Sequence, residues 1–213
     1  MNPSTKSSIG SARPGWTVAF AWVLLLFAGG CAGPQNVLVN LGPYEPQHTE
    51  GANPGAPRGT VRIEPVRDAR ARAVGSLIGQ RTTIGNISMG DVEMSPPPTD
   101  VMAQLLRTEF TQMGYRVVNS AQQFTVGAQL GEFQVMTPAT AMYWDINGSI
   151  MLGVTVTAPD GKKRDASYVA ACTDRTYVYP SEEIIGKVVA GCVRDIGAKL
   201  RGDAALARFI GAR

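Results

Sequence analysis

The chain has 213 residues, with 20 basic residues, 17 acidic residues and one histidine, which give a formal net charge of +3 at neutral pH. Two of the basic residues and no acid lie within the first 30 residues, so the rest of the chain carries only +1. A nucleic-acid-binding surface requires clustered basic residues. The mild basic concentration between Arg62 and Arg81 is interrupted by Glu64 and Asp68, and we interpret it as a solvated surface, the alternative being a contact with anionic lipid head groups. We therefore expect no nucleic-acid partner.

Residues 1–30 have the pattern of a lipoprotein signal peptide. A polar segment with two basic residues precedes an apolar stretch, Trp16 to Phe27, that is too short to span a bilayer permanently. The small residues Ala28, Gly29 and Gly30 suit the cleft of a signal peptidase, and Cys31 follows them directly. We therefore expect cleavage before Cys31 and export of the mature chain.

Cys31 is the predicted site of lipid attachment. A thiol at a new N-terminus can carry a diacylglycerol, and the freed amine can carry a further acyl chain such as palmitate. Two or three such chains, at ~0.8 kcal/mol per buried methylene, give a stable membrane anchor. The alternative is a plain secretory signal in which Cys31 has no role. We favour lipidation because an unpaired thiol beside a cleavage site is a liability in an oxidising compartment.

Residues 31–59 are rich in Pro, Gly, Asn and Gln, and we expect the lipidated cysteine to be followed here by a flexible tether. Within it, Val37 to Leu41 is a candidate short edge strand. A flexible chain of ~25 residues spans a root-mean-square distance of about 25–30 Å, enough to hold a domain clear of a membrane. The one histidine, His48, lies in this segment.

Residues 60–213 are predicted to form a single periplasmic domain. Alternating apolar residues predict a strand at 60–66. Helical spacing predicts a helix that has Thr99 or Asp100 as its N-cap and stops before Gly114. The long stretch 71–98 is punctuated by glycines. Further short strands are expected at 81–84, 92–94 and 115–118, with a longer one from Phe124 that is broken by Pro138.

The C-terminal half contains the strongest local signals. Ile150 to Val156 alternates, Ala158 to Gly161 forms a turn, and Asp165 to Thr173 returns, which predicts a β-hairpin. Ser181 is a candidate N-cap for a long helix that runs to Leu200, and a short final helix follows. This order of elements predicts the α+β class, a two-layer sandwich of an antiparallel or mixed sheet packed against two amphipathic helices.

No set of residues in the sequence has the pattern of a known catalytic or metal-binding site. A single histidine in a tether argues against Ser-His and Cys-His catalysis and against most zinc sites, and the acids have no spacing typical of a calcium loop. We therefore expect a protein that is not an enzyme and that has no cofactor and no metal site.

Two pairs of residues are candidate sites apart from Cys31. Cys172 lies near the end of a predicted strand and Cys192 on the apolar stripe of a predicted helix, so they form either a disulfide or two buried thiols. Tyr143 and Trp144 precede the hairpin and are either a partner contact or residues that pack at the rim of the core. An unpaired sheet edge is a further candidate surface for a partner.

The order of several core and turn motifs resembles the YajG-like lipoproteins of Gram-negative bacteria. These motifs are Val61-Arg62-Ile63 closing on Asp68-Ala69-Arg70, Leu105-Leu106 leading to Met113-Gly114-Tyr115, Val126 to Leu130, the Val154 to Tyr168 hairpin, and Asp195-Ile196 followed by Leu206 and Phe209-Ile210. The resemblance covers nearly all of residues 61–210, and Ala28 stands where the signal of this family usually has Leu. It implies a small envelope lipoprotein and supplies no catalytic residues.

The sequence thus predicts a non-enzymatic lipoprotein whose domain binds a protein or polymer of the cell envelope. Ala32, rather than Asp, follows Cys31, which favours transfer to the outer membrane with the domain facing the periplasm. One alternative is an auxiliary subunit of an envelope transporter or of a lipopolysaccharide assembly machine. Another is a hydrolase with an unrecognised site, against which the absence of histidine from residues 60–213 counts.

Overall fold

The computed structural model describes residues 35–46, 58–71, 75–120 and 123–211. All of them belong to one compact unit. The nine strands are β1 (Val37–Asn40), β2 (Gly59–Ile63), β3 (Arg67–Asp68), β4 (Leu77–Thr82), β5 (Ser88–Ser95), β6 (Tyr115–Val117), β7 (Phe124–Pro138), β8 (Trp144–Thr157) and β9 (Lys163–Thr176). The helices are α2 (Pro98–Gln112), α3 (Glu182–Gly202) and α4 (Ala204–Ile210).

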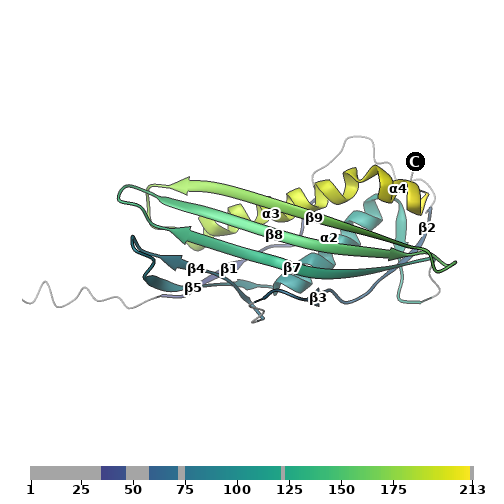
Figure 1. Cartoon of the computed structure of the whole chain (residues 1–213), viewed down its shortest axis with the longest axis horizontal. Helices are drawn as coiled ribbons and strands as arrows, with labels where there is room; N and C mark the ends of the chain where they lie inside the picture. The colour runs from purple at the N-terminus through teal and green to yellow at the C-terminus, as the bar shows by residue number, and fades with distance from the viewer. Residues whose placement is uncertain (1–34, 47–57, 72–74, 121–122, 212–213) are drawn as a thin grey trace, which may run out of the picture. The chain divides into compact units, whose positions relative to one another are not determined.

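The long strand β7 organises the sheet. Along one edge it pairs with β8 in antiparallel register, from Thr125 opposite Thr157 to Met136 opposite Asn147, and β9 then pairs with β8. Along its other edge β7 pairs in parallel with β2, β3 and β4 in succession. β6 extends the sheet beyond β2, and β5 and β1 extend it beyond β4 (Figure 1). The sheet is therefore mixed.

The helices cover one face of this sheet and leave the other face open. Figure 1 shows α2 and α3 on the far side of strands β7 to β9. Alternation along β8 places Ile146, Ile150, Leu152, Val154 and Val156 in the buried core, whereas Met151 is exposed on the other face. The predicted two-layer α+β sandwich with two amphipathic helices is confirmed, with α4 as a short addition.

The observed ends of the helices agree with those predicted from the sequence, with one exception. Ser181 caps α3 by accepting a hydrogen bond from the Ile184 amide, as predicted. α2 starts at Pro98 after Pro97 and has no side-chain cap, so the predicted N-cap at Thr99 or Asp100 is wrong. Proline suits the first turn because its φ is preset and its missing N–H would have no helical partner there.

A buried carboxylate joins the helices to the N-terminal segment. Glu109 of α2 has no exposed surface and accepts two hydrogen bonds of 2.8 Å from Arg201 of α3. The Tyr44 hydroxyl donates a third bond of 2.5 Å to the same carboxylate. Gly197 makes this approach possible, because a Cβ at that position would collide with the Tyr44 hydroxyl. Tyr44 thus fixes the chain after β1 to the helical layer.

Part of the segment expected to be a flexible tether is built into the fold. β1 pairs in parallel with β5, from Val37 opposite Val92 to Asn40 opposite Ser95, and the Val39 side chain is fully buried. The short strand expected at Val37 to Leu41 is therefore present. It is held because its apolar residues complete the core beside α3. Residues 31–34 and 47–57 of the expected tether lie outside the described residues.

Candidate functional site

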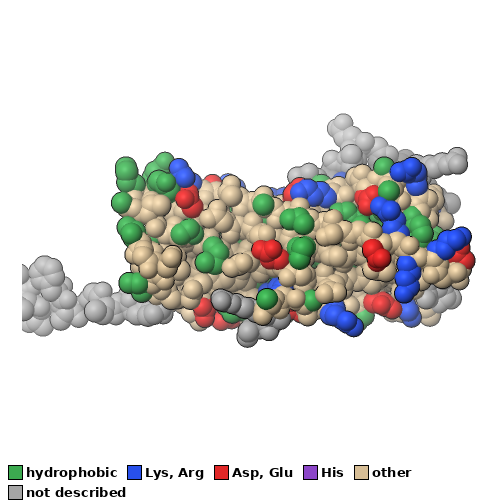
Figure 2. Space-filling view, viewed as in Figure 1, with side chains coloured by type: hydrophobic (Ala, Val, Ile, Leu, Met, Phe, Trp, Pro, Cys, Tyr) green, Lys and Arg blue, Asp and Glu red, His purple; other side chains and the backbone are tan. Residues whose placement is uncertain are grey.

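Exposed apolar side chains gather at one end of the sheet. β4 and β7 end side by side, with Thr82 opposite Pro138, and β9 ends where β8 begins, with Thr176 opposite Trp144. Three loops therefore meet there: the turn between β4 and β5, the loop between β7 and β8, and the loop between β9 and α3. Figure 2 shows hydrophobic side chains gathered over this end, at the left.

Six of the nine large hydrophobic side chains that are exposed among the described residues lie in these three loops. Their exposed fractions run from 47% for Tyr179 to 78% for Met142. We call this set the apolar end. Its members are Ile84, Ile87, Met142, Tyr177, Val178 and Tyr179.

Four aromatic rings form the base of the apolar end. The ring of Tyr143 packs edge-on against Tyr177 with a centroid separation of 6.3 Å. Trp144 packs edge-on against Tyr179 at 5.5 Å. Edge-to-face geometry at such separations is the favoured arrangement of aromatic pairs. The two pairs join the loop before β8 to the loop after β9, so these loops present one continuous aromatic surface.

Two arginines pack against these rings. The Arg175 guanidinium lies 3.8 Å from the Tyr143 ring centroid and forms a 2.9 Å ion pair with Asp145. The hydrogen bond to Asp145 raises the pKa of Arg175, which keeps the side chain charged. The Arg81 guanidinium lies 4.8 Å from the centroid of Tyr179. Such cation–π contacts stabilise the position of the rings relative to the strands.

Arg81 also marks the point where the chain enters the sheet. Its side chain is almost fully buried, and its guanidinium donates a hydrogen bond to the carbonyl of Gln35, the first described residue. The Gln35 amide donates to the Met89 carbonyl at 3.1 Å. Gly90 has a φ of +124° and allows this close approach, because a Cβ there would collide with the Gln35 carbonyl. The N-terminal chain therefore enters the sheet beside the turn that carries Ile87.

The candidate residues found in the sequence have different outcomes. Cys31 lies outside the described residues. Tyr143 and Trp144 are half-buried members of the aromatic base, and their role as a partner contact stays a prediction. Sequence reasoning did not single out Tyr177 and Tyr179. They could have been identified from the sequence Tyr-Val-Tyr, which lies in the loop between a predicted strand and the Ser181 N-cap. An apolar run in such a loop is not explained by burial in the core.

Cys172 and Cys192 are joined in a disulfide in this structure, with their Cα atoms 5.5 Å apart. The bond links β9, at the edge of the sheet, to α3 in the helical layer. Since it uses the two cysteines of the described residues, no free thiol is present in that part of the chain.

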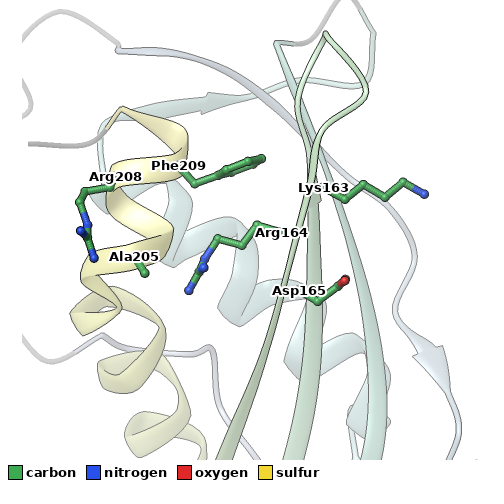
Figure 3. A pocket seen from close by; sticks show the side chains of 6 residues that line it. All are labelled: Lys163, Arg164, Asp165, Ala205, Arg208 and Phe209. Carbon is green, nitrogen blue, oxygen red and sulfur yellow. The ribbon is translucent and has the colours of Figure 1, made fainter.

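The opposite end of the sheet is basic and holds an open cavity of about 630 Å³ between the β8–β9 hairpin and α4 (Figure 3). Figure 3 shows Arg164 directed toward α4, while Lys163 and Asp165 lie on the other side of the hairpin. Arg164 pairs with Asp203 at 3.4 Å, and Arg208 donates to the Ala204 carbonyl. The cations therefore do not converge on one point of this cavity.

A second cavity of about 570 Å³ lies beside β4 and β7. Arg70 lines it, but the Arg70 guanidinium donates to Asp68 and to the carbonyls of Gly75 and Leu77. The hydrogen bond from Arg70 lowers the pKa of Asp68. This arginine therefore holds the loop after β3 in place and has its donors committed to the protein.

No group of three or more His, Cys, Asp or Glu side chains among the described residues is placed to hold a metal ion. None of the described helices combines the length and the apolar character that a membrane-spanning helix requires.

Comparisons with known proteins agree with this fold. A family model described as "Uncharacterized lipoprotein" matches residues 46–211. Protein XCC0632 from Xanthomonas campestris is similar in structure, with 11% identity and a TM-score of 0.53, over 83% of this chain and 96% of that one. At this identity the likeness shows the fold alone.

Two further solved structures are less similar. A minor lipoprotein from Acinetobacter baumannii is 10% identical with a TM-score of 0.39, over 62% of this chain and 95% of that one. Lipoprotein GNA1162 from Neisseria meningitidis is 11% identical with a TM-score of 0.35, over 65% and 98%. No curated protein matches the chain.

Proposed function

Because the chain belongs to the lipoprotein family whose model matches residues 46–211, we propose that it is an outer-membrane lipoprotein whose periplasmic domain binds a partner in the cell envelope without catalysis. The observation that carries this proposal is the coincidence of that family with Cys31, which directly follows the small residues Ala28, Gly29 and Gly30. Cleavage there would leave Cys31 as the first residue, with its thiol and its amine both open to acylation. The finer likeness to YajG-like lipoproteins is part of the same proposal.

The open face of the sheet is the surface that we assign to a protein partner. Gln129 and Gln134 of β7 are exposed, as are Met151 of β8 and Val169 of β9, at 38% and 50%. These side chains belong to three long adjacent strands, so they offer a broad, continuous surface with mixed polar and apolar character. Such a surface suits binding of another folded protein better than enclosure of a small substrate.

Membrane fractionation of cells that produce the wild type or Cys31→Ser tests the anchor. We expect the wild type to float with the outer membrane and to incorporate labelled palmitate. We expect the serine variant to incorporate none, and to be either released as a soluble protein or retained with its signal. Equal partition of both proteins into the outer membrane would contradict lipidation at Cys31.

Crosslinking in cells, followed by mass spectrometry, tests the partner. A benzoyl-phenylalanine placed at Gln134, on the open face, should capture an envelope protein. The same probe at Lys187, an exposed position of α3 in the helical layer, serves as the matched control. Recovery of one stoichiometric transport complex would favour the auxiliary-subunit function, whereas equal capture from both positions would argue against a dedicated binding face.

A further inference from the structure

We infer that the apolar end is a membrane-docking surface, which inserts into the head-group region of the same bilayer that holds the lipid of Cys31. This inference rests on the proposed lipidation of Cys31 and goes beyond it. A lipid on a long tether would hold the protein near a membrane in any orientation. Insertion of the apolar end instead fixes which part of the domain touches the bilayer and which part faces the periplasm.

The first argument is the length of chain between the lipid and the fold. Gln35 is hydrogen-bonded to Met89 and Arg81 beside the turn between β4 and β5. Only four residue steps separate Gln35 from Cys31. Four residues span at most about 14 Å however they are folded, since an extended chain advances at most ~3.6 Å per residue. An acylated Cys31 lies at the membrane surface, so that surface passes within about 14 Å of Gln35.

The second argument is the exposure of the residues at that end. Ile84 and Ile87 flank the tip of the β4–β5 turn and are 64% and 68% exposed. Met142 and Val178 lie on the two neighbouring loops and are comparably exposed. Water-exposed apolar groups cost free energy, which insertion into the acyl boundary would recover at ~25 cal/mol per Å². Contiguous apolar surface of this kind marks an interaction site on most soluble domains.

The third argument is the kind of aromatic residue at the base. Trp144 with Tyr143, Tyr177 and Tyr179 combines apolar rings with polar atoms at their edges. Tryptophan and tyrosine are enriched at the level of lipid head groups for this reason. Tyr177 and Tyr179 are themselves exposed members of the apolar end, and the half-buried rings of Tyr143 and Trp144 pack against them, so the set suits the head-group level when Ile84 and Ile87 enter the acyl boundary.

The charges near this end favour insertion over electrostatic attraction. Asp145 and Arg175 neutralise each other across 2.9 Å, and Arg81 is buried. Asp174 and Glu183 are exposed close to the same loops and would repel anionic head groups. Salt screens this repulsion, so docking should not weaken as the ionic strength rises, unlike the binding of a basic patch, which salt weakens.

A bilayer is also the occupant that geometry favours. A partner protein on the apolar end would have to fit between this end and a membrane that passes within about 14 Å of Gln35. A folded domain is thicker than that. The open face of the sheet and the basic end of the β8–β9 hairpin have no such restriction, so they remain accessible to proteins.

Trp144 is a built-in reporter for this inference. The chain has three tryptophans, and the other two, Trp16 and Trp22, lie in the segment that cleavage before Cys31 removes. The experiment uses the lipidated full-length mature protein in phosphatidylethanolamine–phosphatidylglycerol vesicles that carry bromine at defined acyl positions. We expect loss of Trp144 emission, largest for bromines closest to the head groups and no smaller at high salt than at low salt.

A second reporter controls for orientation. Trp144→Phe combined with Lys163→Trp moves the fluorophore to the start of β9, opposite the last residue of β8. This position is about 43 Å from Trp144, the length of the 14 residues of β8. Its emission should be the same with and without bromine. Quenching of both reporters would indicate that the domain lies flat on the bilayer, which contradicts docking through the apolar end.

A charged variant of the tip tests the residues that insert. Ile84→Asp with Ile87→Asp changes two exposed turn positions, and Met142→Asp provides an independent change on a second loop. We expect each variant to float with the vesicles through its lipid but to lose most of the bromine quenching of Trp144. Quenching equal to wild type in both variants would overturn the inference.

The outcomes separate this inference from the proposed function. If the wild type floats but Trp144 is not quenched, the anchor stands and membrane docking is wrong. If the wild type does not float, the lipid anchor fails and the docking inference fails with it. Protection of the apolar end by a crosslinked protein instead of by lipid would also overturn the inference.

Discussion

Replacing Tyr44 with phenylalanine should weaken the fold measurably although most of the side chain remains. The change removes the hydroxyl that donates to the buried Glu109 carboxylate at 2.5 Å and leaves the two bonds from Arg201 in place. A hydrogen bond to a charged group contributes ~1.5–3 kcal/mol. We expect the lower value, about 1.5 kcal/mol, because Tyr44 is only partly buried and its carboxylate partner keeps two donors.

This loss corresponds to a decrease in Tm of about 3–6 °C, since 1 kcal/mol shifts the Tm of a domain of this size by ~2–4 °C. Urea and thermal denaturation of the purified mature protein would measure it. Tyr177→Phe is the matched control, because Tyr177 is 75% exposed and its change should cost less than ~0.5 kcal/mol. A cost for Tyr44→Phe as small as that of the control would refute the role assigned to the Glu109 cluster.

The stability of wild type and that of Tyr44→Phe should also depend differently on pH in the alkaline range. Burial, and then the hydrogen bond to Glu109, raise the pKa of Tyr44 well above its ordinary value. The contribution of Tyr44 is therefore complete below pH ~10, where the unfolded chain ionises, and is lost as the pH rises further. The difference in the free energy of unfolding between wild type and Tyr44→Phe should therefore decrease above pH 10. The decrease should be at most ~1.4 kcal/mol per pH unit, and less where solvent screens the hydroxyl.

Three further predictions concern the stability of the fold. Gly197→Ala should cost ~1–3 kcal/mol because the added methyl group would overpack against the Tyr44 hydroxyl. Gly191→Ala should instead stabilise α3 by ~0.5–1 kcal/mol, because the nearest atom outside the local backbone lies 4.0 Å from the added Cβ. Equal changes in the free energy of unfolding would contradict this packing. Reduction of the bond between Cys172 and Cys192 should lower the free energy of unfolding by ~2–4 kcal/mol, and thiol labelling of the unreduced protein should detect neither cysteine. Ser181→Ala should cost ~0.5–2 kcal/mol through loss of the N-cap, and an unchanged Tm would argue against capping.

Elements built from local signals were predictable from the sequence. The hairpin of β8 and β9, the Ser181 N-cap of α3 and the glycine that ends α2 all depend on residues close in sequence. The α+β class followed from their order. The exception, the start of α2, arose because the sequence has three prolines and two possible caps within five positions, and proline geometry prevailed.

Contacts between distant segments were not predictable. The pairing of β1 with β5 joins residues more than fifty positions apart, and nothing in the short apolar run at Val37 to Leu41 specifies that partner. The apolar end likewise exists only because β4 ends beside β7 and β9 ends beside β8, which brings Ile84, Met142 and Tyr177 together. Each of these residues alone resembles an ordinary exposed loop residue.

The mass of the intact protein extracted from membranes bears most directly on the proposal of a lipid-anchored domain. We expect a chain that begins at Cys31 and exceeds the mass of residues 31–213 by a diacylglycerol with or without one further acyl chain. Fragmentation should place the whole added mass on Cys31. A chain that begins at Cys31 without added mass, or one that keeps residues 1–30, would contradict the lipid anchor and the membrane docking that depends on it.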